Sequence, residues 1–183
     1  YSWSPSTGLS SSTASNPMAN PSANTVYTLT ETVTATGCQQ SNSVTVNINS
    51  LPAANAGANQ TICNLQSVQI GAASVAGNTY SWLPSTNLSS STVSDPLANP
   101  SATTVYTLTE IITATGCQKS NSITVNVNPL PVANAGTDQT ICENSGVQIG
   151  APPVGGNTYN WVPSTALSLA SASDPTASPS STT

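Results

Sequence analysis

The most reactive side chains of this sequence belong to four cysteines, Cys38, Cys63, Cys117 and Cys142. The intervals between them are 25, 54 and 25 residues, and the chain contains no histidine. Zinc sites draw their ligands from closely spaced Cys and His pairs, so this spacing argues against zinc. Calcium is a weaker alternative, because no calcium-loop pattern of aspartates occurs. Cysteines at fixed positions are typical of disulfides in an oxidising compartment, so we expect disulfides and no metal site.

The chain contains few of the residue types that commonly act in catalysis. The 183 residues include 30 Ser, 27 Thr and 19 Asn, but one lysine (Lys119), no arginine and no histidine. No histidine and no Ser-x-x-Lys pair is present to activate a hydroxyl nucleophile. We therefore expect no catalytic residue, no cofactor and no enzymatic activity. One cation cannot neutralise nucleic acid phosphates, and no apolar run of about 18 residues is present to span a membrane.

The sequence that surrounds these residues is repeated along the chain. Trp3, Trp82 and Trp161 are 79 residues apart, and 57 of 79 positions are identical between residues 1–79 and 80–158. Such identity indicates tandem duplication. Leu-Pro junctions at 51 and 130 divide the chain into three parts. Residues 1–50 are the C-terminal part of one repeat, 51–129 a complete repeat and 130–183 the N-terminal part of the next, so we expect a segment of a longer array.

Each repeat is predicted to consist of short β-strands. The strongest patterns are residues 104–109 and 122–128, which alternate apolar with polar residues and flank a Gly-containing turn at 115–118. Further strands are expected at 68–71, at 79–82 and, as an edge strand, at 54–62. Residues 84–100 are expected to form a long loop with one weak strand. About seven short strands in one repeat, without helix, predict a β-sandwich.

Large aromatic side chains mark the expected core: Trp3, Tyr27, Trp82, Tyr106 and Trp161. Trp82 occupies the place of the core tryptophan in an immunoglobulin-like sandwich, and Tyr106 lies near the start of the penultimate strand. Burial in the core is expected in preference to a role as a ligand platform.

A glutamate interrupts the apolar alternation of residues 27–34 and recurs one repeat later. Alternation places Glu31 on the same face as Tyr27 and Leu29, and Glu110 occupies the matching position. A carboxylate that points inward without a cation is costly. We therefore expect a β-bulge that turns it outward, with a functional acid as the alternative.

The combined motifs resemble the tandem Ig-like repeats, related to polycystic-kidney-disease (PKD) domains, of very large surface proteins in Bacteroidota, gliding-motility adhesins among them. The strings that carry the resemblance are Leu130-Pro131 with AGTDQTIC (135–142), VQIG (147–150), YNWVPST (159–165), TVYTLT (104–109) and GC (116–117). Membership would imply type IX secretion and an extracellular, cell-surface location. The sequence departs from the family pattern at Glu31-Thr32 and Glu110-Ile111, which are inserted relative to the usual run.

An Ig-like topology leaves the disulfide pairing open. It would place Cys63 in the turn after the first strand and Cys117 in the last hairpin turn, at opposite poles of the sandwich. Two cysteines can pair only if their Cα atoms lie within about 7 Å. A bond between the first-turn cysteine of one repeat and the last-hairpin cysteine of the next is therefore as plausible as an intra-repeat bond or free thiols.

These observations predict a structural segment of an extracellular bacterial surface fibre or adhesin, acting as a semi-rigid stalk or filament. Neighbouring repeats are the expected partners, and low charge favours self-association into filaments. One alternative is a glycan-binding module that contacts surface polysaccharide through residues 84–100 or the Trp82 face. The other is a non-catalytic spacer in a secreted enzyme.

Overall fold

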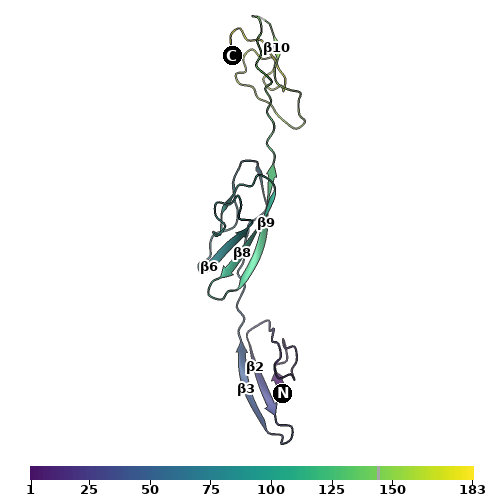
Figure 1. Cartoon of the computed structure of the whole chain (residues 1–183), viewed down its shortest axis with the longest axis vertical. Coiled ribbons are helices and arrows are strands. Elements are labelled where there is room, and N and C mark those ends of the chain that lie inside the picture. Colours follow the sequence, from purple (N-terminus) through teal and green to yellow (C-terminus); the bar gives the residue numbers. More distant parts are fainter. Residues whose placement is uncertain (144) are drawn as a thin grey trace. The chain divides into compact units, whose positions relative to one another are not determined.

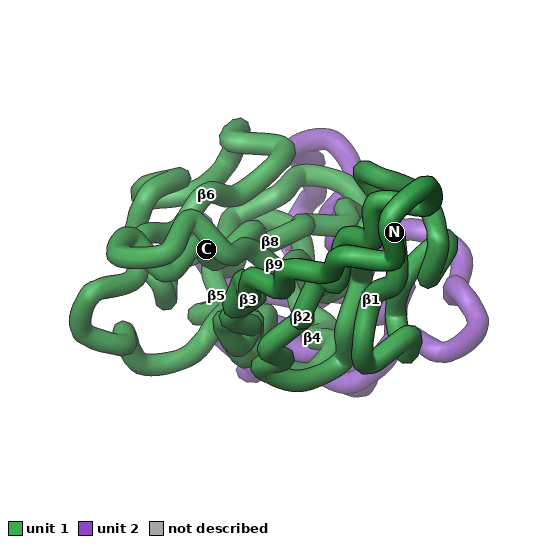
Figure 2. Tube along the Cα trace, turned by 90° about the horizontal axis from the view of Figure 1, so that it is seen from below, with its two compact units in different colours: residues 1–127 green, residues 128–183 purple. Residues whose placement is uncertain are grey.

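The computed structural model describes residues 1–143 and 145–183. All regular secondary structure in these two ranges is β-strand (Figure 1), which confirms the expected all-β class. No helix able to cross a membrane occurs among the described residues. The chain forms two compact units, Tyr1–Val127 and Asn128–Thr183, which Figure 2 colours separately.

A four-stranded sheet forms one layer of the complete repeat. Its strand order is β4 (Gln60–Cys63), β9 (Gln118–Asn128), β8 (Thr104–Ile112) and β6 (Asn78–Leu83). The central strand β8 pairs antiparallel with both β9 and β6. Its side chains alternate as predicted, because Tyr106 and Leu108 point into the core while Val105 is exposed.

A two-stranded sheet of β5 (Val68–Gln69) and β7 (Leu97–Ala98) forms the second layer. The buried cluster takes residues from both sheets: Ala56, Ile62, Ile70, Trp82, Ala98, Tyr106, Leu108, Ile123 and Val125. Two sheets around one apolar cluster are consistent with a β-sandwich. The complete repeat has six strands, β4 to β9, where about seven were expected, and residues 84–100 contribute the short β7.

Hydroxyl pairs cover the outer face of the large sheet. Thr107 and Thr109 of β8 lie within 2.9 Å of the hydroxyls of Ser122 and Ser120 on β9. The same pairs recur one repeat earlier, at Thr28 with Ser43 (2.9 Å) and Thr30 with Ser41 (2.8 Å). The rows of Ser and Thr therefore form cross-strand hydrogen bonds on an exposed face.

The two end parts reproduce complementary portions of the complete repeat. Residues 1–50 form the sheet β1 (Ser2–Ser4), β2 (Thr25–Thr32) and β3 (Gln39–Val46), in that order. Its register pairs Trp3 with Leu29, as β6 and β8 pair Trp82 with Leu108. In the second unit, β10 (Val147–Gln148) pairs with β11 (Thr176–Ala177), as β5 pairs with β7.

The predicted bulge at the glutamates is wrong. From Thr104–Val125 to Ile111–Gln118, each residue pair of β8 and β9 keeps one register, and the pairs of β2 and β3 do the same. Glu110 therefore stays on the inward face with Tyr106 and Leu108, and it is only 3% exposed. Hydrogen-bond donors rather than a change of register accommodate its carboxylate.

Candidate functional site

The best-defined polar site of the chain lies where the backbone enters the complete repeat. Glu110 on β8 accepts two hydrogen bonds there, one from each of two other segments. The backbone N–H of Ala54 donates to Oε2 at 2.7 Å, and the side-chain amide of Asn78 on β6 donates to Oε1 at 2.7 Å. We call Ala54, Asn78 and Glu110 the joint site.

The joint site satisfies a buried carboxylate without using a cation. Lys119 is the residue of β9 opposite Glu110, but its side chain is exposed. Burial disfavours a charged group, whereas two N–H donors at short distance stabilise it. No buried side-chain nitrogen or oxygen lacks a hydrogen-bond partner in the described part of the chain. The geometry suits a structural contact, because the carboxylate is buried and each of its oxygens accepts a hydrogen bond from another segment of the chain.

Side chains also hold the segment that follows Ala54. The N–H of Ala56 donates to Oδ1 of Asn121 on β9 at 3.2 Å, and the carbonyl of Ala56 accepts from the N–H of Gly71 at 2.9 Å. Because these bonds replace a regular ladder, only residues 60–63 of the predicted edge strand at 54–62 form β4. Pro52, Ala54 and Ala56 nevertheless alternate as buried residues with exposed neighbours.

The same motif is open in residues 1–50. Glu31 and Cys38 correspond to Glu110 and Cys117, but both are exposed. Glu110 is buried where Ala54 and Asn78 donate hydrogen bonds to it from two other segments. The difference in burial therefore follows from the neighbouring segments and not from the strand sequence.

The cysteines form no disulfide within the described residues. Cys38, Cys63 and Cys142 are exposed, whereas Cys117 is half-buried and its Sγ lies 4.0 Å from the carbonyl oxygen of Asn49. Cys117 is therefore next to the linker that precedes its own repeat. The role of the cysteines in disulfides, and their pairing, stay predictions. No cluster of metal-ligating side chains occurs in the described ranges.

The expected core aromatics hold the long loop through their polar atoms. Nε1–H of Trp82 donates to the carbonyl of Val93 at 2.9 Å, and the hydroxyl of Tyr106 donates to the carbonyl of Thr86 at 3.3 Å. The same bonds recur from Trp3 to Ala14, from Trp161 to Ala172 and from Tyr27 to Thr7. Trp82, Tyr106 and Tyr27 are buried, whereas Trp3 and Trp161 are half-buried. Burial raises the pKa of the Tyr106 hydroxyl.

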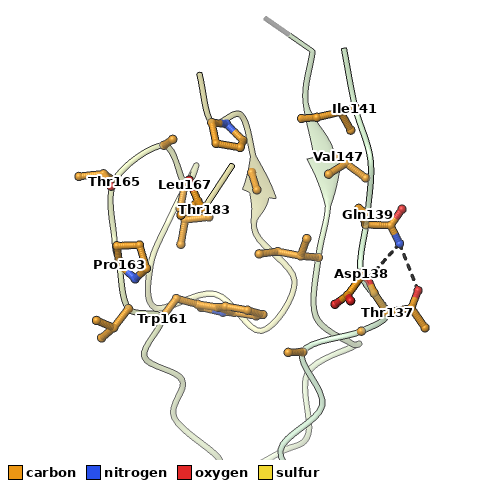
Figure 3. A pocket seen from close by; sticks show the side chains of 17 residues that line it. Thr137, Asp138, Gln139, Ile141, Val147, Trp161, Pro163, Thr165, Leu167 and Thr183 are labelled. Carbon is orange, nitrogen blue, oxygen red and sulfur yellow. Dashed lines mark hydrogen bonds between the residues drawn. The ribbon is translucent and has the colours of Figure 1, made fainter. Parts of the chain in front are cut away.

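A hollow in residues 130–183 exposes side chains that are core in the complete repeat. Ile141, Val147, Ile149, Trp161, Leu167 and Ala177 line it, and they correspond to Ile62, Val68, Ile70, Trp82, Leu88 and Ala98 (Figure 3). In the complete repeat, β8 and β9 cover these positions. The hollow is thus lined by the same positions that form the core of residues 51–127.

The sequence did not identify the joint site, although it carried a signal. Glu110 was expected to point outward, and the amide of Asn78 was not singled out. The signal was the recurrence of an inward glutamate at one strand position in both repeats.

Comparison with known proteins adds no family to this description. No protein-family model matches the chain, and no curated protein matches it.

Proposed function

We propose that this chain is a structural repeat segment of an extracellular bacterial surface fibre or adhesin, and that it acts as a semi-rigid stalk or filament. The proposal assigns its repeats to the Ig-like, PKD-like class of Bacteroidota surface proteins exported by the type IX route. It makes neighbouring repeats the main partners, with self-association into filaments and contact with surface polysaccharide as further interactions.

The observation that carries the proposal is the joint site within a tandem duplication. Repeats with 57 identities in 79 positions supply length by repetition. A stalk also requires that each repeat holds the segment that connects it to the one before. Ala54, the fourth residue of the complete repeat, is 4% exposed and hydrogen-bonded to Glu110. Pro52 restricts the same segment further.

The alternatives receive less support. A glycan platform built on Trp82 needs an exposed ring, and that ring is 0% exposed. Binding through the loop at residues 84–100 stays a separate candidate, as does a spacer role beside a catalytic domain.

Electron microscopy of the secreted parent protein tests the proposal. We expect thin fibres with regular beads spaced by about 35–45 Å, which is the length of one sandwich plus its joint estimated from strand rise. Antibodies against residues 51–127 should label intact cells at their surface. Irregular coils, or a globular secreted enzyme without fibres, would contradict the stalk.

A further inference from the structure

The segment Leu51–Ala54 is held by side chains rather than by a neighbouring strand. It belongs to no sheet, yet Pro52 and Ala54 are buried. The donor–acceptor pair that ends this segment is the N–H of Ala54 with Oε2 of Glu110. A hydrogen bond to an ionised, buried partner is stronger than one between neutral groups. The path of the backbone into the repeat therefore depends on one carboxylate.

Glu110 connects three elements through this carboxylate. Its backbone belongs to β8, its Oε2 binds the linker at Ala54, and its Oε1 binds Asn78 at the start of β6. An apolar residue of similar size would fill the space but would leave the N–H of Ala54 without a partner. A buried donor without a partner favours any conformation that returns it to water.

A second linker in the chain allows a comparison with Leu51–Ala54. Leu130–Ala133 has the same Leu-Pro-x-Ala pattern as Leu51–Ala54, but Pro131 and Ala133 are exposed. The two linkers thus have similar residues but differ in burial, and the buried linker is the one that is hydrogen-bonded to Glu110 on β8.

We propose that Glu110 is a positioning residue that fixes the joint between consecutive repeats by making Leu51–Ala54 part of the folded repeat. This inference deepens the proposed function and rests on it only for the tandem arrangement. It assigns the recurring inward glutamate to the control of joint rigidity, a role distinct from filling the core.

Hydrogen exchange on the wild-type chain, measured by NMR, gives the first test and needs no variant. We expect the Ala54 amide to exchange at least about tenfold more slowly than the Ala133 amide, because only Ala54 has a buried acceptor. Equal exchange rates at the two amides would overturn the proposal.

Three variants give the second test. Glu110→Leu should speed exchange at Ala54 by about ten- to a hundredfold. Glu110→Gln should largely preserve the wild-type rate, because its amide oxygen can accept from Ala54 while a flipped Asn78 accepts from its NH₂ group. Glu31→Leu is the matched control, since Glu31 is exposed and should leave Ala54 unchanged. Retained protection in Glu110→Leu, or an equal loss in Glu31→Leu, would overturn the proposal.

Residual dipolar couplings separate control of the joint from simple stability. In the wild type, one alignment tensor should fit residues 1–48 and 56–127 together. In Glu110→Leu under folding conditions, two tensors should be needed. If a folded Glu110→Leu keeps one tensor, Glu110 is a stabilising residue only and the proposal fails. Failure of the stalk would appear instead in microscopy of the parent protein, with the joint still fixed.

Discussion

Residues 51–127 and the two end parts have nearly the same sequence but different environments. Ile123 on β9 is 1% exposed, whereas Val44, its counterpart on β3, is 51% exposed. Trp82 is fully buried, whereas Trp161 lies half-buried beside an open hollow. Local sequence accounts for the strand pairs in all three parts, but only the complete repeat has both layers around its core.

This difference indicates that a closed core needs residues from both ends of the complete repeat, because its buried cluster combines side chains near both ends of residues 51–127. The β8–β9 hairpin covers side chains that lie before Trp82 in the sequence. We therefore expect the stability of residues 51–127 to depend on the cluster that both of their sheets enclose.

The largest expected effect comes from truncating the central tryptophan of the complete repeat. Trp82→Ala removes a fully buried ring and its hydrogen bond to Val93, and should lower the free energy of unfolding of residues 51–127 by about 3–5 kcal/mol. Trp3→Ala and Trp161→Ala are matched controls that should change it by less than about 1 kcal/mol, because independent sites act separately. Denaturant unfolding followed by NMR signals of β8 and β9 measures the difference. Similar losses in all three variants would show that the end parts fold cooperatively with the centre.

A smaller loss is expected from Gly71→Ala. Gly71 has a φ of +86°, and a Cβ there would overlap the carbonyl oxygen of Ser94. Left-handed strain and the forced backbone shift should together cost about 2–5 kcal/mol. Gly116→Ala is the matched control: it has a φ of +71° but no atom near the added Cβ, so about 1–2 kcal/mol is expected. Thermal unfolding followed by circular dichroism compares them, and equal costs would refute the proposed close approach.

The sequence predicted the hairpin because its signals are local. Alternation along residues 104–109 and 122–128, with Gly116 in the turn between them, specifies β8 and β9 without reference to the rest of the chain. The core roles of Trp82 on β6 and Tyr106 on β8 were also predicted from their positions within strands. The long loop was predicted as a loop, and its single weak strand is β7.

The sequence could not show which distant donors would satisfy Glu110. Ala54 lies 56 residues before it, and its contribution is a backbone N–H that every residue except proline has. A local rule therefore favoured a bulge over an inward carboxylate. The predicted edge strand was too long for the same reason, since Asn121 binds the Ala56 amide from a distant part of the sequence.

The smallest expected effect is a difference in thiol reactivity between Cys38 and Cys117, which occupy the same hairpin turn in two repeats. Cys38 is exposed, while Cys117 is half-buried against the carbonyl of Asn49. Because reaction with a thiol reagent requires access to the sulfur, Cys117 should react several-fold more slowly than Cys38 under native conditions. Mass spectrometry after brief alkylation, with a fully reduced and unfolded chain as control, gives both rates. Equal native rates would show that the linker at Asn49 does not cover the turn, which would restrict the difference between the complete and partial repeats to their cores.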